Sequence, residues 1–264
     1  MRINIDLIKK LRLKSGISII ECKNALIKSK GNIENAIMIL KENEKIKANN
    51  KINNIAIRGI ILTHVINNHA YLIEVNCETD FVEKHDDFVN FVHDALVIAH
   101  DKNIKDIALL KCVLEKKRLL LISKFNENIV IRRFFVLFGD NISDYLHHDR
   151  IGVILHASSK KNDLLKKVSM HIAASRPDFI SRDDIPNSLI EQEKKIQLNI
   201  ALRSGKSVLI SKKIVHGRIE KFINDICLLE QNFIFDISKK VKDFLEDNHI
   251  KILQFARFEL GEDI

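Results

Sequence analysis

The chain contains no tryptophan and only two tyrosines among its 264 residues. Any stacking platform for single-stranded nucleic acid would therefore depend on phenylalanine. Cysteine is also scarce, and its four copies lie far apart without any C-x-x-C pair (Cys22, Cys77, Cys112 and Cys227). This spacing argues against a disulfide framework or a zinc site and favours reduced thiols in a cytosolic protein.

Long apolar segments are absent as well. No run approaches the roughly 18 apolar residues that a helix needs to cross a bilayer. The first residues, Met1 to Asp6, carry both a base and an acid, too early for the apolar region of a secretory signal. We therefore predict a cytoplasmic protein without a membrane partner.

The sequence also lacks the motifs of familiar enzymes. It has no glycine-rich phosphate loop, and neither H-E-x-x-H nor G-x-S-x-G occurs. Cys77 invites an enzyme hypothesis, but no histidine can be paired with it from sequence, so a buried strand thiol is favoured. We predict that the protein is not an enzyme, with no catalytic residue, no cofactor and no metal.

Positive charge is what the chain has in excess. Its 43 basic and 35 acidic residues give a net charge of +8, which permits contact with RNA or with an acidic protein surface. The bases occur as scattered pairs with acids nearby, such as Lys160–Lys161 and Lys239–Lys240. We interpret them as a solvated surface and expect no direct nucleic-acid contact. A basic RNA- or ribosome-associated binding protein is the alternative.

Residues 1–54 are expected to form a small helical module with its linker. Apolar spacing predicts three short helices within residues 1–41, the first ending at Ser15–Gly16 and the second opening with a capping box at Ser18–Glu21. Residues 41–54 are rich in Lys, Asn and Glu and form the best linker candidate. Three such helices bury little apolar surface, so the module should dock on something else.

An α+β core of two similar halves is predicted beyond the linker. Its first half, residues 55–140, contains two strands, two helices and a β-rich run (59–66, 70–75, 88–99, 104–124 and 129–138). The second half is split into residues 141–179 and 228–264. Its first part shows a strand at 151–155 and a helix at 164–172 that Pro177 ends.

Residues 180–227 separate the two parts of the second half. Helical patterns at 188–203 and 207–226 meet at Ser204–Lys206, and four apolar residues of the second helix have coiled-coil spacing (Val215, Ile219, Phe222 and Ile226). We expect a protruding antiparallel coiled-coil hairpin. It should contact either a second copy of the chain, forming a dimer, or another partner, and the sequence leaves both open.

One short run carries a family resemblance. Glu74 to Lys84 reads E-V-N-C-E-T-D-F-V-E-K and ends an apolar strand with an acid–aromatic pair, Asp80–Phe81. It closely resembles the signature of bacterial elongation factor Ts, the nucleotide-exchange factor of the GTPase elongation factor Tu. Residues 11–26 resemble the second signature of that family, in its ubiquitin-associated-like N-terminal domain. Three further runs also resemble the family (127–133, 170–179 and 257–262).

The resemblance implies a function and a set of site residues. The chain would bind elongation factor Tu with GDP, disturb its magnesium site, and promote GDP release and GTP loading in translation elongation. The residues that match the segment acting on the magnesium site are Thr79, Asp80, Phe81 and Val82. Those that match partner-binding positions are Ile19, Ile20 and Lys23 in the N-terminal module, and Phe125, Asn126 and His147 in the core.

Plainer interpretations exist for several of these residues. Phe81 would fill the local core, and Ile19 and Ile20 would belong to a helix core, although neighbours cannot both point fully inward. His147–Asp149 suggests a metal cluster, but a surface turn is favoured.

The chain also departs from the family pattern at two places. Glu83 replaces the usual small residue, which leaves the shape of the tip open. The sequence stops at Ile264, where many relatives continue, and this implies a lower affinity for the partner.

Overall fold

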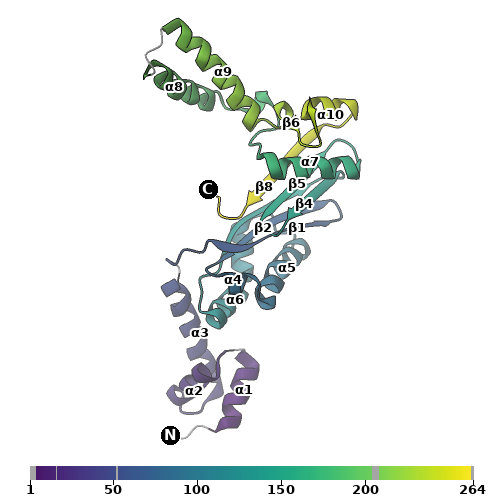
Figure 1. The fold of residues 1–264 in the computed structure, drawn as a ribbon. Helices are drawn as coiled ribbons and strands as arrows, with labels where there is room; N and C mark the ends of the chain where they lie inside the picture. The colour runs from purple at the N-terminus through teal and green to yellow at the C-terminus, as the bar shows by residue number, and fades with distance from the viewer. Residues whose placement is uncertain (1–3, 16, 52, 204–207, 263–264) are drawn as a thin grey trace.

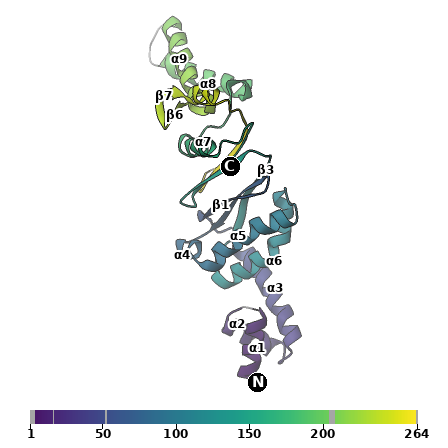
Figure 2. The same cartoon turned by 90° about the vertical axis from the view of Figure 1, so that its right-hand side faces the viewer.

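Helices and small antiparallel sheets alternate along the chain in the computed structural model, which describes residues 4–15, 17–51, 53–203 and 208–262. The fold is α+β, as predicted. The molecule is elongated, with the N-terminal helices at one end, two sheets in the middle and a pair of long helices at the other end (Figures 1 and 2). None of the helices in the described ranges combines the length and the hydropathy that crossing a bilayer requires.

The N-terminal end contains the three predicted helices around one small core. They are α1 (Ile5–Ser15), α2 (Ile19–Lys28) and α3 (Ile33–Lys51). The capping signal is confirmed in part, because the Ser18 hydroxyl accepts a hydrogen bond from the Glu21 amide at 3.4 Å. Apolar residues from all three helices, together with Ile17 between the first two, form the core (Ile8, Leu11, Ile17, Cys22, Ala25, Leu26, Ala36 and Leu40).

Most of the expected linker, residues 41–54, is helical. Helix α3 continues through it to Lys51. Lys and Glu are good helix formers, so their abundance indicated a polar segment and not an irregular one. Residue 52 and the predicted helix stop at Gly16 lie outside the described residues.

Two three-stranded antiparallel sheets form the core. The first has the order β1-β2-β3 and the second β4-β5-β8. Their strands are β1 (Arg58–Ile66), β2 (His69–Cys77), β3 (Val130–Phe138), β4 (Ile142–His147), β5 (Ile151–Ala157) and β8 (Ile252–Glu259). The first hairpin turns at Asn67, whose φ of 55° suits asparagine. The predicted strands are confirmed, whereas the pattern did not reveal β4 or β8.

Each sheet has helices on its outer face (Figure 2). Two helices cover the first sheet, α5 (Asp86–Asp101) and α6 (Ile107–Phe125). The second sheet is covered by α7 (Asn162–Ser175), with α10 (Val241–Asp247) and the small hairpin of β6 (Asn232–Phe233) and β7 (Asp236–Lys240) at its end. Along β2, Ile73 and Val75 face the helices, while Leu72 packs between the two sheets.

The inner faces of the sheets are in close contact. At Gly152 on β5, an added Cβ would lie 2.6 Å from side-chain atoms of both Ile61 and Leu72. The Ile61 amide also donates to the Asp149 carbonyl at 2.8 Å. Only a glycine at this position lets the second sheet approach the first so closely.

An ionic network accompanies this contact. Glu74, on β2, is fully buried and accepts hydrogen bonds from Arg133 at 2.6 Å and from Arg132 at 3.1 Å. Arg133 also reaches Glu262 at 3.0 Å and lies over the ring of Phe258. A buried carboxylate needs such partners, and here they tie the C-terminal segment to the first sheet.

A pair of long helices extends from the second sheet. They are α8 (Asn187–Arg203) and α9 (Val208–Ile226), which lie side by side (Figure 1). Arg218 donates to Gln197 across the pair at 3.0 Å. The four residues with coiled-coil spacing belong to the apolar cluster of this pair. The expected joint at Ser204–Lys206 lies outside the described residues.

The close sheet contact makes a stability prediction. Gly152→Ala should lower the free energy of unfolding by about 1–3 kcal/mol, because the new methyl group overpacks the interface. The control is Gly217→Ala on α9, where an added Cβ meets nothing within 4 Å. That variant should gain up to about 1 kcal/mol from helix propensity. Urea unfolding of both proteins checks this, and an unchanged Gly152→Ala variant would contradict the packing.

Burial favours the neutral form of the histidine of α7. In His171, Nε2 lies 2.9 Å from Oε1 of Gln231, and Nδ1 accepts a hydrogen bond from the Ile234 amide at 3.3 Å. Burial lowers the pKa of His171 from its ordinary 6.5, against the opposing effect of the Gln231 hydrogen bond. Protonation of Nδ1 would also place its N–H against the Ile234 amide, which is itself a donor, and this disfavours the charged ring.

This histidine should make stability depend on pH. Below pH 6.5 the unfolded chain takes up a proton that the folded protein resists, so acidification lowers the free energy of unfolding. One such group contributes at most about 1.4 kcal/mol per pH unit. His171→Gln should therefore lose less stability than the unmodified protein between pH 7 and pH 5. Exposed His93→Gln is the control, and equal slopes for all three proteins in urea unfolding would refute the assignment.

Candidate functional site

A short helix at the end of β2 presents an aromatic side chain to solvent. The chain leaves β2 at Cys77 and forms α4 (Asp80–Glu83). The side chain of Phe81 is 84% exposed, whereas Val82 is buried in the core beneath it. Asp80 is also exposed and pairs with Lys84 at 3.4 Å. The structure thus excludes the plainer interpretation that Phe81 fills the local core.

Thr79 fixes the start of this helix to its surroundings. Its amide and its hydroxyl both donate to the carboxylate of Glu127, at 3.0 Å and 2.6 Å. Its carbonyl accepts a hydrogen bond from the Cys77 thiol at 3.3 Å. The predicted segment 79–82 is therefore anchored at one end and buried at Val82, with Asp80 and Phe81 exposed between.

Glu83, where the sequence departs from the pattern that it resembles, has a contact of its own. Its carboxylate accepts a hydrogen bond from the Gly59 amide at 3.4 Å. Gly59 has a φ of 149°, and a Cβ there would lie 2.2 Å from the Val75 carbonyl oxygen. Glu83 thus joins the end of α4 to the start of β1.

Two of the three predicted core residues lie beside this tip. Phe125 ends α6 and meets the ring of His85 edge-on, with centroids 4.8 Å apart. Asn126 is exposed and adopts the left-handed conformation, with a φ of 57°. Residue 127, next in sequence, supplies the carboxylate that holds Thr79.

The third residue, His147, lies in the other sheet. It is exposed at the end of β4, and its Nδ1 lies 3.0 Å from the Tyr145 hydroxyl. His148 and Asp149 follow in an exposed turn with φ values of 50° and 55°, in agreement with the predicted surface turn. Within the ranges that the structure covers, no group of three or more His, Cys, Asp or Glu residues is arranged to hold a metal ion.

The predicted contacts of the N-terminal module are all on the surface of α2. Ile19 and Ile20 are 52% and 71% exposed, and Lys23 is exposed as well. Neither isoleucine is a core residue, so that alternative is wrong for both. Helix α2 lies well apart from α4 (Figure 1), and only a macromolecule is large enough to touch both.

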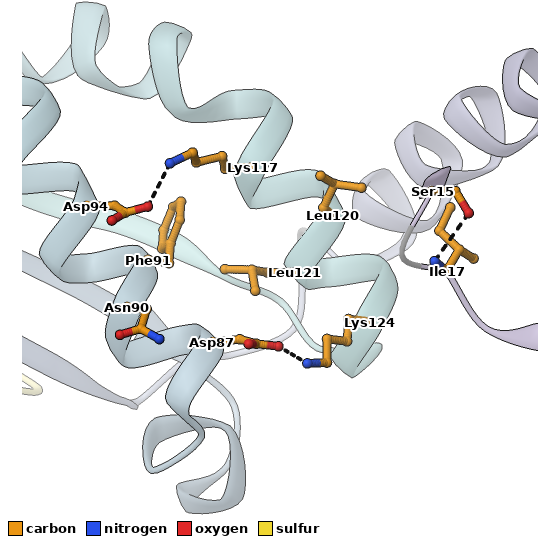
Figure 3. Close-up of a pocket in the computed structure, with 10 residues that line it drawn as sticks. All are labelled: Ser15, Ile17, Asp87, Asn90, Phe91, Asp94, Lys117, Leu120, Leu121 and Lys124. Carbon is orange, nitrogen blue, oxygen red and sulfur yellow. Dashed lines mark hydrogen bonds and ion pairs between the residues drawn. The ribbon is translucent and has the colours of Figure 1, made fainter. Parts of the chain in front are cut away.

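The charged side chains in the groove between the N-terminal helices and α6 are paired with one another and do not indicate a ligand site. A cavity of about 440 Å³ lies there, with Ser15 and Ile17 on one side and α5 and α6 on the other (Figure 3). Its two lysines are paired across the helices, Lys117 with Asp94 and Lys124 with Asp87. The lysines and aspartates that line this cavity therefore neutralise one another in pairs.

Several other basic residues are also paired with acids. Arg182 meets Glu220 at 2.7 Å, and Lys239 meets Asp247 at 2.8 Å. Lys240 meets Glu230 at 2.6 Å. These pairs support the interpretation of a mixed, solvated surface more than that of a basic face for RNA.

Sequence reasoning missed Glu127 as part of the site. The residue stands in the run E-N-I-V-I-R-R, which carried a resemblance but no chemical role. No spacing rule connects it with Thr79, 48 residues earlier in the chain. Only the fold brings the two together.

Comparison with known proteins gives the class and then the family. Residues 78–262 match the family model described as elongation factor TS. The elongation factor Ts of Blochmanniella pennsylvanica is 46% identical over 267 residues, covering 100% of this chain and 98% of that protein. The proteins of that name from Buchnera aphidicola subsp. Acyrthosiphon pisum (strain 5A) and Cronobacter sakazakii are 45% and 40% identical, covering 99% of this chain and 98% and 93% of theirs.

The fold and these matches define a bacterial translation elongation factor. More particularly, the chain belongs to the elongation factor Ts family. The family model includes the whole α4 tip, and the full-length relatives extend the likeness to the N-terminal helices.

The thiols give a test of the enzyme hypothesis. Burial, together with the nearby carboxylates of Glu127 and Glu83, raises the pKa of Cys77 to about 12. Burial likewise raises the pKa of Cys227 to about 11. Iodoacetamide at pH 7 should therefore label exposed Cys112 and leave Cys77 and Cys227 unmodified until the protein unfolds. Rapid, selective alkylation of native Cys77, read by mass spectrometry, would favour a catalytic thiol instead.

Proposed function

We propose that this protein is the guanine-nucleotide exchange factor of elongation factor Tu. It binds the GTPase in its GDP form, disturbs the magnesium site, and so promotes GDP release and GTP loading in translation elongation. The observation that carries the proposal is the exposure of Phe81 on an anchored helix, in a chain of the elongation factor Ts family. In this role the chain itself performs no chemical reaction and needs no cofactor.

The chemistry of the partner explains why a small protrusion is sufficient to disturb it. A GTPase holds GDP through loop amides, a lysine and a magnesium ion that bridges protein and phosphate oxygens. Magnesium requires near-ideal octahedral geometry, so a small displacement of its surroundings weakens it sharply. We assign that displacement to the segment Thr79–Val82, with Phe81 inserting and Asp80 beside it. Factor and nucleotide then weaken each other reciprocally.

The free energy required is larger than one side chain provides. A shift of roughly ten-thousandfold in affinity needs about 5.5 kcal/mol of differential binding. Burial of one phenylalanine contributes about 1.5–3 kcal/mol. Further contacts must therefore act in parallel. We assign them to Ile19, Ile20 and Lys23 on the N-terminal module, and to Phe125, Asn126 and His147 on the core.

A division of the chain into functional parts accompanies this proposal. Residues 1–54 form a ubiquitin-associated-like module that binds the GTPase. Residues 55–140 carry the tip, and residues 141–179 with 228–264 form the second half of the core. Residues 180–227 form an antiparallel coiled-coil hairpin. On α8, Ile196 and Ile200 are 45% and 47% exposed, and these apolar side chains favour a dimer contact through the hairpin.

The direct test is release of a fluorescent GDP analogue from elongation factor Tu, followed by stopped flow. Phe81→Ala should slow release by roughly ten- to a hundredfold, because the burial energy of one phenylalanine is lost. The matched control is Phe138→Ala, since Phe138 is also an exposed phenylalanine, at 61%, but lies at the end of β3. That variant should release GDP at the unmodified rate.

Two outcomes would contradict the proposal. One is an unchanged release rate with Phe81→Ala. The other is that the protein fails to bind the nucleotide-free GTPase and instead binds RNA with a steep dependence on salt, as a basic RNA-binding protein does.

A further inference from the structure

The base of the tip is held by carboxylates that come from elsewhere in the chain. Glu127 lies in the connection between α6 and β3, not on α4. One of its oxygens accepts the backbone amides of both Glu78 and Thr79, at 3.1 Å and 3.0 Å, and the other accepts the Thr79 hydroxyl at 2.6 Å. One side chain thus binds the three donors that precede the helix.

A second carboxylate, that of Glu78, accepts a hydrogen bond from the residue after Glu127. Glu78 accepts the Asn128 amide at 2.6 Å and the side-chain amide of Asn54 at 2.9 Å. Asn128 is 3% exposed, and its own side chain donates to the Asn54 carbonyl at 2.9 Å. The segments at residues 54, 78–79 and 127–128 are therefore linked by reciprocal hydrogen bonds.

This arrangement is more specific than a general helix cap. Thr79 is the residue before α4, and its hydroxyl makes no capping bond to the helix. The hydroxyl is instead turned to Glu127. The consequence is a fixed orientation of the backbone from which Asp80 and Phe81 project. Hydrogen bonds to a charged acceptor are the strong ones, so three on one carboxylate give a stiff joint.

We propose that Glu127 is a positioning residue for nucleotide exchange, which orients the Asp80–Phe81 tip by binding the Glu78–Thr79 backbone and the Thr79 hydroxyl. This inference rests on the proposed function and adds to it a residue that does not touch the partner's magnesium site. Its effect passes entirely through Phe81. The pre-formed tip enters the GTPase without first having to be ordered, which is the advantage of preorganisation.

The test is a double-mutant cycle on GDP release at saturating factor, with Glu127→Ala, Phe81→Ala and the double variant. Glu127→Ala should lower the maximal release rate by at least about tenfold, because a misplaced group loses most of its effect. In the Phe81→Ala background the same change should alter the rate by less than about twofold, because coupled residues are non-additive. Glu127→Gln retains an acceptor for the two amides and should restore part of the rate.

A control separates this effect from general loss of stability. Glu115 on α6 accepts two hydrogen bonds from Arg118 of the same helix, at 2.8 Å and 2.9 Å, and is not bonded to residues 78–83. Glu115→Gln should release GDP at the unmodified rate. Thr79→Val removes only the hydroxyl bond and provides a milder variant, expected to fall between Glu127→Ala and the unmodified protein.

Hydrogen exchange tests the geometry without the partner. The amides of Glu78 and Thr79 should exchange faster in Glu127→Ala, while those of β2 residues 71–75 stay protected.

If Phe81→Ala slows release and Glu127→Ala does not, the positioning role is overturned and the proposed function stands. If Glu127→Ala slows release equally with and without Phe81, Glu127 does not act through the tip, and the inference is also wrong. If Phe81→Ala releases GDP at the unmodified rate, the proposed function itself is overturned.

Discussion

The burial of β2 on both faces is the constraint on which the rest of this structure depends. One face packs under α5 and α6 through residues such as Ile73, and the other lies against the second sheet through Leu72. A one-residue shift in register would exchange the two faces of this strand and carry buried Glu74 into the apolar cluster under the helices. Its last residue, Cys77, leads directly to the helix that carries Phe81. The exposed aromatic is therefore supported by the most buried strand of the first sheet.

Charge plays two different roles around this strand. Glu74 is buried and pairs with Arg132 and Arg133 of the same sheet, and Arg133 in turn reaches Glu262 and so joins the two halves of the core. Glu127 is half-buried, and backbone and hydroxyl donors satisfy it at the edge of the core. The first carboxylate holds the arginine that joins the two halves, and the second holds the base of the tip.

The arrangement of exposed groups favours a large partner. The isoleucines of α2 lie at one end of the molecule, and the tip lies in its middle (Figure 1). The cavity between α5, α6 and the N-terminal residues is lined by lysines that acids already neutralise. These separate exposed groups on an elongated body suit the proposed role, in which a GTPase is bound at several places and one aromatic acts on it.

The sequence by itself determined the order of helices and strands where the apolar period was strong. Helices α5 to α7 follow from spacing, because one-sided burial forces apolar residues to recur at fixed intervals. Strands β1 and β2 follow from two short apolar runs separated by a turn. The positions of the polar elements did not follow from apolar spacing. Residues 41–51 continue α3, and β4 has no marked apolar face, since composition reports exposure and not backbone conformation.

The residues at the tip were recognisable from one continuous run, Thr79–Val82, but their exposure was not. Whether Phe81 points inward or outward depends on what packs beside α4, and that is set by segments distant in the chain. The contacts of Glu127 with Thr79 and of Gly152 with Ile61 join residues that local periodicity cannot relate. Only the tertiary structure decided them, because a hydrogen bond or a close approach depends on distance in space and not on separation in sequence.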